Sequence, residues 1–242
     1  MNHRAVQRAL FRMQLDPGFA ARLRAGESDA GLGPGELALL RKADPAALSA
    51  DRGGRRRSQF LRNVSEEFAR SCAAGVPADG FTSSPEFHAA VARDTSLPLA
   101  FGRYAERCCA NGSPGRRALV GLERALARAR RELRAACAPA PGEIALAPWA
   151  WLVSLPAGTL DLAAGGRNAL AADGEETVLV LATPNSVPFR LRDVEAELLS
   201  PDLARLLASL ERPRPRHELG EGTDEIVAEL LGDGVLVEGA PR

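Results

Sequence analysis

The chain has 242 residues, of which 45% are hydrophobic, 26% charged and 5% aromatic, and its formal net charge is zero. This composition predicts an ordinary soluble globular protein, and no apolar run reaches the roughly 18–20 residues that a membrane-spanning helix needs. Because aromatic side chains are so few, we expect the core to consist of Leu, Ala and Val.

The even charge balance hides two halves of opposite sign. Residues 1–137 carry 23 basic and 14 acidic residues, whereas residues 138–242 carry 8 basic and 17 acidic residues. The N-terminus contains arginines but no uninterrupted apolar segment after them, which is not the pattern of a secretory signal. We therefore expect a cytoplasmic protein in two parts, which either attract each other or meet separate partners.

The first 137 residues predict a helical domain. Polar residues followed by proline, as at residues 16–17 and 84–85, provide an N-cap and a first helical residue that needs no N–H partner. Apolar side chains then recur at helical spacing over residues 52–74 and 114–137. We expect these helices to pack on one another as a bundle.

A segment rich in proline and alanine, residues 138–142, marks the predicted domain boundary. Beyond it, residues 143–155 and 159–163 have strand-like runs. Residues 177–181 (TVLVL) are the clearest strand, because they are apolar throughout and rich in β-branched side chains. Residues 187–191 are expected to return beside that strand.

Three helices and a last strand complete the C-terminal half. Residues 193–199 predict a short helix, residues 200–201 start a second, Thr223 caps a third, and residues 235–237 form the last strand. A small sheet followed by three helices is the order of a winged-helix-like or peptide-recognition-like module.

The predicted fold class is therefore α+β, in two domains. Residues 1–137 form a helical domain, and residues 143–242 form a small domain of a sheet plus three helices.

Side chains that commonly carry out chemistry are scarce. The three histidines, His3, His88 and His217, lie far apart in the sequence, and the positions three and four residues after His88 hold Val91 and Ala92 rather than metal ligands. The cysteines are expected to be buried free thiols in helices: Cys72, Cys108, Cys109 and Cys137. The sequence therefore predicts a non-catalytic protein with no metal or cofactor of its own.

Arginine is concentrated in two of the predicted helices. Residues 55–57 open one of them, and further arginines line the helix of residues 114–137 behind its leucines. This pattern indicates either a solvated helix face or a surface for an acidic partner. Nucleic acid is not expected as a partner, because no aromatic side chains are interleaved for base stacking and the last predicted helix begins with Asp224 and Glu225.

Two tryptophans, Trp149 and Trp151, lie two residues apart in a predicted strand and are expected to face the same side. Such a pair indicates either anchors in the core or a contact with a partner subunit. Together with Arg55 and Arg56 they form the predicted partner interface.

Several segments together resemble the partner proteins of multinuclear nonheme iron-dependent oxidative enzymes. They are residues 15–19, Leu23, residues 26–27, Leu37, Leu40, residues 44–45, 51–57, 176–182, 189–191 and 194–199. In that family the iron enzyme is a separate TIM-barrel chain, and the partner binds it and helps to present a ribosomally made precursor peptide whose cysteine is oxidatively modified. The resemblance implies a role in RiPP biosynthesis, as one half of a heterodimer whose iron belongs to the other subunit.

The C-terminal half also resembles a precursor-peptide recognition element, in which a leader peptide adds a strand beside a small sheet and against a helix. Such binding needs an unpaired strand edge next to an apolar groove, and the sequence does not show which edge is free. We expect arginines beside the last strand to pair with acidic leader residues. The predicted peptide-binding residues are Thr177, Val178, Leu179, Val180, Leu181, Arg190, Arg192, Leu203, Leu206, Leu207 and Leu210.

Two further functions are compatible with the sequence. One is a regulatory or scaffolding protein that acts alone. The other is a helical companion subunit of a dioxygenase, because the first 70 residues are similar to the small subunit of ring-opening extradiol dioxygenases.

Overall fold

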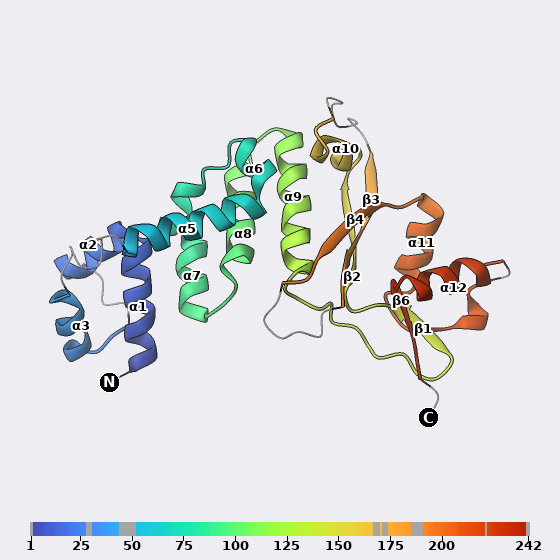
Figure 1. Cartoon of the computed structure of the whole chain (residues 1–242), viewed down its shortest axis with the longest axis horizontal. Helices are drawn as coiled ribbons and strands as arrows, with labels where there is room; N and C mark the ends of the chain where they lie inside the picture. The colour runs from blue at the N-terminus through green and yellow to red at the C-terminus, as the bar shows by residue number, and fades with distance from the viewer. Residues whose placement is uncertain are drawn as a thin grey trace. The chain divides into compact units, whose positions relative to one another are not determined.

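The structure is a computed structural model that describes residues 2–27, 31–43, 52–166, 170, 174–184, 191–220 and 222–240. The chain divides into two compact units, Met1–Arg116 and Arg117–Arg242, which Figure 1 draws from blue to green and from green to red. The first unit is helical and the second combines strands with helices, so the fold class is α+β as predicted. In the part of the chain that the structure describes, no helix is both long enough and apolar enough to cross a membrane.

Some helices of the first unit begin where the sequence places a polar residue before proline. The carboxylate of Asp16 accepts a hydrogen bond from the Phe19 N–H at 3.0 Å, and the hydroxyl of Ser84 accepts one from the Phe87 N–H at 3.2 Å, as N-caps do. The similar pair at residues 44–45 lies outside the described residues. The elements of this unit are α1 (His3–Leu15), α2 (Pro17–Ala25), α3 (Pro34–Arg41), α5 (Arg52–Glu67), α6 (Ala69–Ala73), the 3-10 helix η1 (Ala78–Ser83), α7 (Pro85–Arg93) and α8 (Leu97–Cys109).

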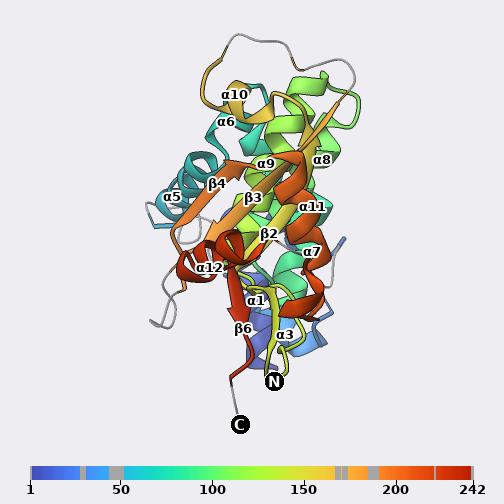
Figure 2. The ribbon, with the colours of Figure 1, turned by 90° about the vertical axis from the view of Figure 1, so that its right-hand side faces the viewer.

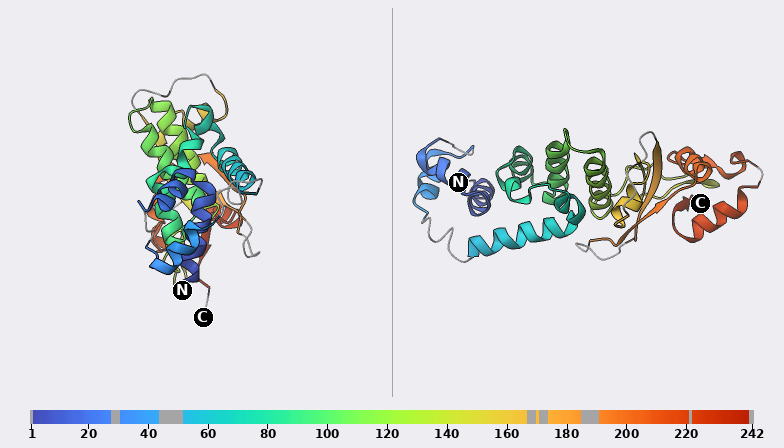
Figure 3. Two further views of the ribbon diagram at one scale, coloured as in Figure 1. Left: turned by 90° about the vertical axis from the view of Figure 1, so that its left-hand side faces the viewer. Right: turned by 90° about the horizontal axis from the view of Figure 1, so that it is seen from above.

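Aromatic rings form the centre of this unit. The helix α5 runs across α7 and α8, which Figure 3 shows from above. The fully buried ring of Phe81 has its centroid 5.1 Å from that of Phe101, 5.5 Å from those of Phe87 and Tyr104, and 6.1 Å from that of Phe60. The expectation of a core of Leu, Ala and Val is therefore corrected here, because the few aromatic residues gather in one place.

The second unit contains two antiparallel sheets of three strands each, in the orders β2-β3-β4 and β5-β1-β6. Figure 2 shows β2, β3 and β4 side by side, with α11 next to β2. The elements of this unit are β1 (Glu143–Leu146), β2 (Ala150–Pro156), α10 (Thr159–Ala163), β3 (Glu175–Ala182), β4 (Val194–Leu198), α11 (Pro201–Ser209), β5 (Arg214–Pro215), the 3-10 helix η2 (Arg216–Glu218), α12 (Asp224–Gly232) and β6 (Leu236–Glu238).

Residues 178–181 in the middle of β3 are all apolar because both faces of this strand are covered. On one face, Val178 and Val180 pack with Leu122 of α9 (Pro114–Ala129). On the other face, Leu179 and Leu181 pack into a cluster with the leucines of α11 and α12. A strand buried on both sides needs no alternation of polar and apolar side chains.

This packing explains where the two units divide. Leu122 and Ala129 of α9 belong to the same buried cluster as Val178 of the sheet, so most of that helix belongs with the strands. The division accordingly falls after Arg116 and not at residues 138–142, where the change in composition places it.

The helix α9 ends earlier than the predicted helix of residues 114–137. Guanidinium groups satisfy two of its closing carbonyls, a common device at helix ends. Arg131 Nη1 donates to the Ala127 carbonyl at 3.0 Å, and Arg192 Nη1 donates to the Ala129 carbonyl at 3.4 Å. The chain beyond it has no regular secondary structure up to β1, and Cys137 there is exposed and outside any helix, contrary to the prediction of a buried helical thiol.

Residues 159–163 form the helix α10 and not a strand. Gly158 before it adopts the left-handed conformation, with φ 89°, which reverses the chain at no steric cost. The carboxylate of Glu176 then accepts hydrogen bonds from the N–H groups of Gly158 and Leu160 at 2.8 and 3.2 Å. A carboxylate supplied by β3 therefore holds the start of this helix.

Residues 193–199 contain the strand β4 and not a helix. Val194 and Ala196 pack against the sheet's cluster on the α9 side, while Glu195 and Glu197, which alternate with them, are exposed, and this is the alternation of a strand. Two α-helices, with η2 between them, follow this sheet in place of the three helices predicted. The predicted return strand of residues 187–191 lies outside the described residues except for its last one.

Candidate functional site

The strand predicted to bind a peptide lies in the middle of its sheet. Residues 177–181 belong to β3, which pairs with β2 on one side and with β4 on the other. Val178, for example, lies opposite Val153 and Leu198. Both edges of β3 are therefore occupied, and a peptide cannot add to this strand.

The leucine face predicted to line the groove belongs to the core. Leu207 and Leu210 are fully buried, and Leu203 and Leu206 are half-buried against the same cluster. α11 is a nine-residue amphipathic helix. Its apolar face packs against the sheet, as the apolar face of a surface helix usually does.

Of the two arginines predicted to bind the peptide, Arg192 is engaged elsewhere in the fold. Arg192 Nη1 donates to the Glu132 carbonyl at 2.9 Å, just beyond the end of α9, so its guanidinium is engaged within the fold. Arg190 lies outside the described residues, as does the side chain of Arg56. Arg55 lies on α5 in the first unit and is exposed.

The two tryptophans pack inside the second unit. Trp149 precedes β2, contacts the clusters on both sides of the sheet, and donates from Nε1 to the Gly234 carbonyl at 2.8 Å. Trp151 packs on the α9 side, where the guanidinium carbon of Arg128 lies 4.3 Å from the centre of its ring system, a cation–π contact. Their contacts are those of core anchors.

Main-chain groups without strand partners lie along the outer edge of β2. Among the described residues, β2 pairs only with β3. The Ala182 N–H donates to the Trp149 carbonyl at 3.0 Å, so every second residue from Trp149 onward is bonded to β3. The N–H and C=O groups of Leu152 and Ser154 therefore point outward. Pro156, at the next outward position, has no N–H to leave unpaired.

The edge along β4 is also unpaired in the described residues, but it is less suited to a further strand. The Leu199 N–H donates to the Thr177 carbonyl at 3.0 Å, which leaves Ala196 and Leu198 with their main-chain groups pointing outward. The exposed carboxylates of β4 oppose the addition of a strand there, as charges on edge strands generally do.

A groove of about 700 Å³ runs beside the edge of β2. Leu152, Ser154 and Thr177 of the sheet form one side of it, and Ala204 and Ala208 of α11 form the other. The groove thus combines an unpaired strand edge with an apolar helix surface, which is the combination that strand addition requires.

Acidic side chains outnumber basic ones around this groove. Glu175, Glu176 and Glu211 line it, against Arg205. Glu175 Oε2 accepts a hydrogen bond from the hydroxyl of Ser154 at 2.6 Å. This charge favours a ligand with basic or neutral side chains and does not favour the acidic leader residues that the sequence suggests.

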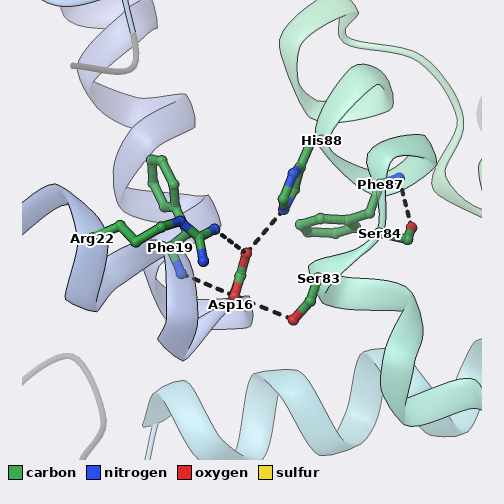
Figure 4. Close-up of polar contacts among 7 residues, drawn as sticks. All are labelled: Asp16, Phe19, Arg22, Ser83, Ser84, Phe87 and His88. Carbon is green, nitrogen blue, oxygen red and sulfur yellow. Dashed lines mark hydrogen bonds and ion pairs between the residues drawn. The ribbon is translucent and has the colours of Figure 1, made fainter. Parts of the chain in front are cut away.

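A second polar cluster lies in the first unit (Figure 4). The fully buried carboxylate of Asp16 has Oδ2 2.9 Å from His88 Nε2 and 3.9 Å from Arg22 Nη2, and its Oδ1 accepts hydrogen bonds from Ser83 Oγ at 3.3 Å and from the Phe19 N–H at 3.0 Å. Through these contacts the Asp16 carboxylate links α2, η1 and α7. Sequence reasoning missed the pair of Asp16 and His88 because 72 positions separate the two residues.

The surroundings of His88 lower its pKa and so favour the neutral ring. Burial lowers the pKa of His88 from its ordinary value, and the positive charges of Arg12 and Arg22 lower it further, whereas the hydrogen bond to Asp16 and the charge of Asp16 raise it. The hydroxyl of Ser83 bonds to the same carboxylate. The cluster therefore has the geometry of a buried helix cap shared by three elements.

Among the described residues, no three side chains of the metal-binding types come together. Comparison of the chain with protein-family models, with curated proteins and with solved structures gives no match. The candidate site accordingly stands on the geometry of this chain alone.

Proposed function

We propose that the second unit binds a precursor peptide as an added strand along β2, and that the chain is the non-catalytic partner of an iron-dependent peptide-modifying oxidase. The observation that carries the first half is the unpaired edge at Leu152 and Ser154, which lies beside the groove under α11. The second half rests on the family resemblance of the sequence.

The bound peptide takes its main-chain hydrogen bonds from four groups, the N–H and C=O of Leu152 and of Ser154. Its side chains alternate in direction, so every second one enters the groove and packs on Ala204 and Ala208 of α11. A basic side chain in the peptide lies near Glu211 at the groove's edge. Main-chain bonds provide affinity in this mode, and the groove provides selectivity.

In this proposal the second unit works as a peptide-recognition module of the winged-helix-like kind, in which a small sheet and the helices after it share a ligand. The oxidase is a separate TIM-barrel chain that forms a heterodimer with this one in the cytoplasm and holds the iron. Trp149 and Trp151 pack in the core. Of the four residues predicted for the partner interface, the proposal therefore keeps Arg55 and Arg56.

Reconstitution of the chain with the proposed oxidase and its precursor peptide tests both halves together. In Ser154→Pro the outward N–H is lost while the ladder to β3 stays intact. We expect this variant to co-elute with the oxidase but to support peptide modification at least about tenfold more slowly, the effect of losing a hydrogen bond and the neighbouring contact.

The matched control is Ala196→Pro, which removes an outward N–H from the opposite edge at β4. It is expected to support modification within about twofold of the wild-type rate, a difference below 0.5 kcal/mol. Slow modification with Ala196→Pro and normal modification with Ser154→Pro contradicts the placement of the peptide. Separate elution of chain and oxidase contradicts the partnership.

A further inference from the structure

A row of arginines on α1 faces α7 in the first unit. Arg4, Arg8 and Arg12 recur every four residues and so lie on one face of the helix. A cavity of about 400 Å³ lies beside Arg4 and Arg8, and another of about 430 Å³ lies beside Arg8 and Arg12. Arg8 and Val91 of α7 line both cavities, and the two cavities together are called the groove below.

The positive charge of this groove is only partly neutralised. Asp94, at the end of α7, is hydrogen-bonded to Arg4 and lies 3.9 Å from Arg8 Nη2, and Arg4 lowers the pKa of Asp94 from its ordinary value. The buried Asp16 behind the groove is engaged by His88 and lies near Arg22. One carboxylate lines the groove against three guanidinium groups.

The guanidinium of Arg12 is partly buried, and one of its three nitrogens has no hydrogen-bond partner in the described part of the chain. Its Nε is buried and has no hydrogen bond from the described residues, and its Cζ lies 3.7 Å from the ring centroid of Phe19. Burial lowers the pKa of Arg12, an effect that Arg22 adds to and Asp16 opposes. An anion bound beside Arg12 offsets the cost of removing this charge from water.

The remaining walls of the groove are apolar. Phe11 is 41% exposed, and Phe11, Val91 and Leu97 line the cavity on the side of Arg4. Exposed aromatic surface next to guanidinium groups suits a ligand with both carboxylates and apolar groups.

We propose that this groove between α1 and α7 binds an acidic peptide segment in extended conformation, with carboxylates at alternate positions. Four residues of helix advance about 6 Å, and two residues of an extended peptide advance about 6.6–6.8 Å. Successive carboxylates of such a peptide therefore reach Arg4, Arg8 and Arg12 in turn. A phosphate site more often draws on main-chain N–H groups at a helix N-terminus, whereas the donors here are side chains on successive turns.

This groove belongs to the first unit and the β2 edge to the second, so neither proposal depends on the other. The test uses the full chain and a fluorescently labelled synthetic peptide that alternates Asp and Leu, with a counterpart in which Asn replaces each Asp. We expect the Asp peptide to bind at least about tenfold more tightly, because charge-assisted hydrogen bonds to arginine are stronger than neutral ones, and its affinity to fall as salt is added.

Two variants locate the bound peptide. Arg4→Gln/Arg8→Gln is expected to weaken binding of the Asp peptide by at least about tenfold. The control Arg103→Gln, which removes one charge from the exposed surface of α8, is expected to leave binding within about twofold.

Three results overturn this proposal. They are equal affinity for the Asp and Asn peptides, unchanged affinity of the Arg4→Gln/Arg8→Gln variant, and complete displacement of the Asp peptide by inorganic phosphate at constant ionic strength. The last result assigns the groove to a phosphorylated ligand.

Discussion

Val180→Pro is expected to unfold the second unit. Val180 is fully buried in the central strand, and its N–H donates within the ladder to Trp151 of β2. Proline at this position removes that hydrogen bond and forces its ring into a packed sheet, which costs about 3 kcal/mol or more. Val178→Pro is expected to act in the same way, because Val178 exchanges the equivalent bonds with Val153.

Hydrogen exchange detected by mass spectrometry measures this effect segment by segment. We expect the peptides that cover β2, β3 and β4 to lose protection in Val180→Pro and to keep it in Ser154→Pro, since Ser154 lies on the edge strand. Native protection of β3 in Val180→Pro, together with loss of protection in Ser154→Pro, contradicts the strand order β2-β3-β4.

Asp16→Ala is expected to destabilise the first unit by about 3 kcal/mol. The carboxylate of Asp16 accepts hydrogen bonds from the Phe19 N–H, from Ser83 and from His88. All three donors lose their partner when the side chain is truncated, and each such loss costs about 1 kcal/mol.

Ser84→Ala is the matched control, because Ser84 caps only α7, through its bond to the Phe87 N–H. Loss of this cap alone is expected to cost about 1 kcal/mol. Denaturant unfolding followed by circular dichroism gives both values. Equal costs for Asp16→Ala and Ser84→Ala contradict the role of Asp16 as a cap shared by three elements.

Much of the helical part of the fold can be predicted from local sequence. The caps at Asp16 and Ser84 lie at helix starts because they act within one turn of the chain. By contrast, residues 159–163 form a helix because Glu176, on a later strand, satisfies the N-terminal N–H groups. Because that carboxylate lies on a strand distant in the sequence, the residues of the helix themselves do not indicate a helix.

The candidate site, too, can be predicted only in part from local sequence. Residues 177–181 are correctly predicted as a strand because they combine β-branched and apolar side chains. The apolar run of residues 178–181 reflects burial on both faces and a central position in the sheet. The strand that offers an edge, β2, carries one local signal. Pro156 has no N–H to contribute at an outward position, which is typical of an edge strand.

The order of charged residues along the sequence also does not predict which of them face a ligand. Arg192 lies beside the last strand of the sheet, yet its guanidinium is bound to carbonyls at the end of α9. The groove at β2 is instead lined by Glu175, Glu176 and Glu211. Only the folded chain determines which charges meet a ligand and which are used internally.

Amide hydrogen exchange at single residues, measured by NMR with and without the precursor peptide, tests the central claim most directly. We predict that the amides of Leu152 and Ser154 exchange at least about tenfold more slowly when the peptide is bound, because each gains a hydrogen-bond acceptor. The amides of Ala196 and Leu198 on the opposite edge serve as the internal control and are expected to keep their rates. Slower exchange at Ala196 and Leu198, with no change at Leu152 and Ser154, contradicts peptide binding along β2.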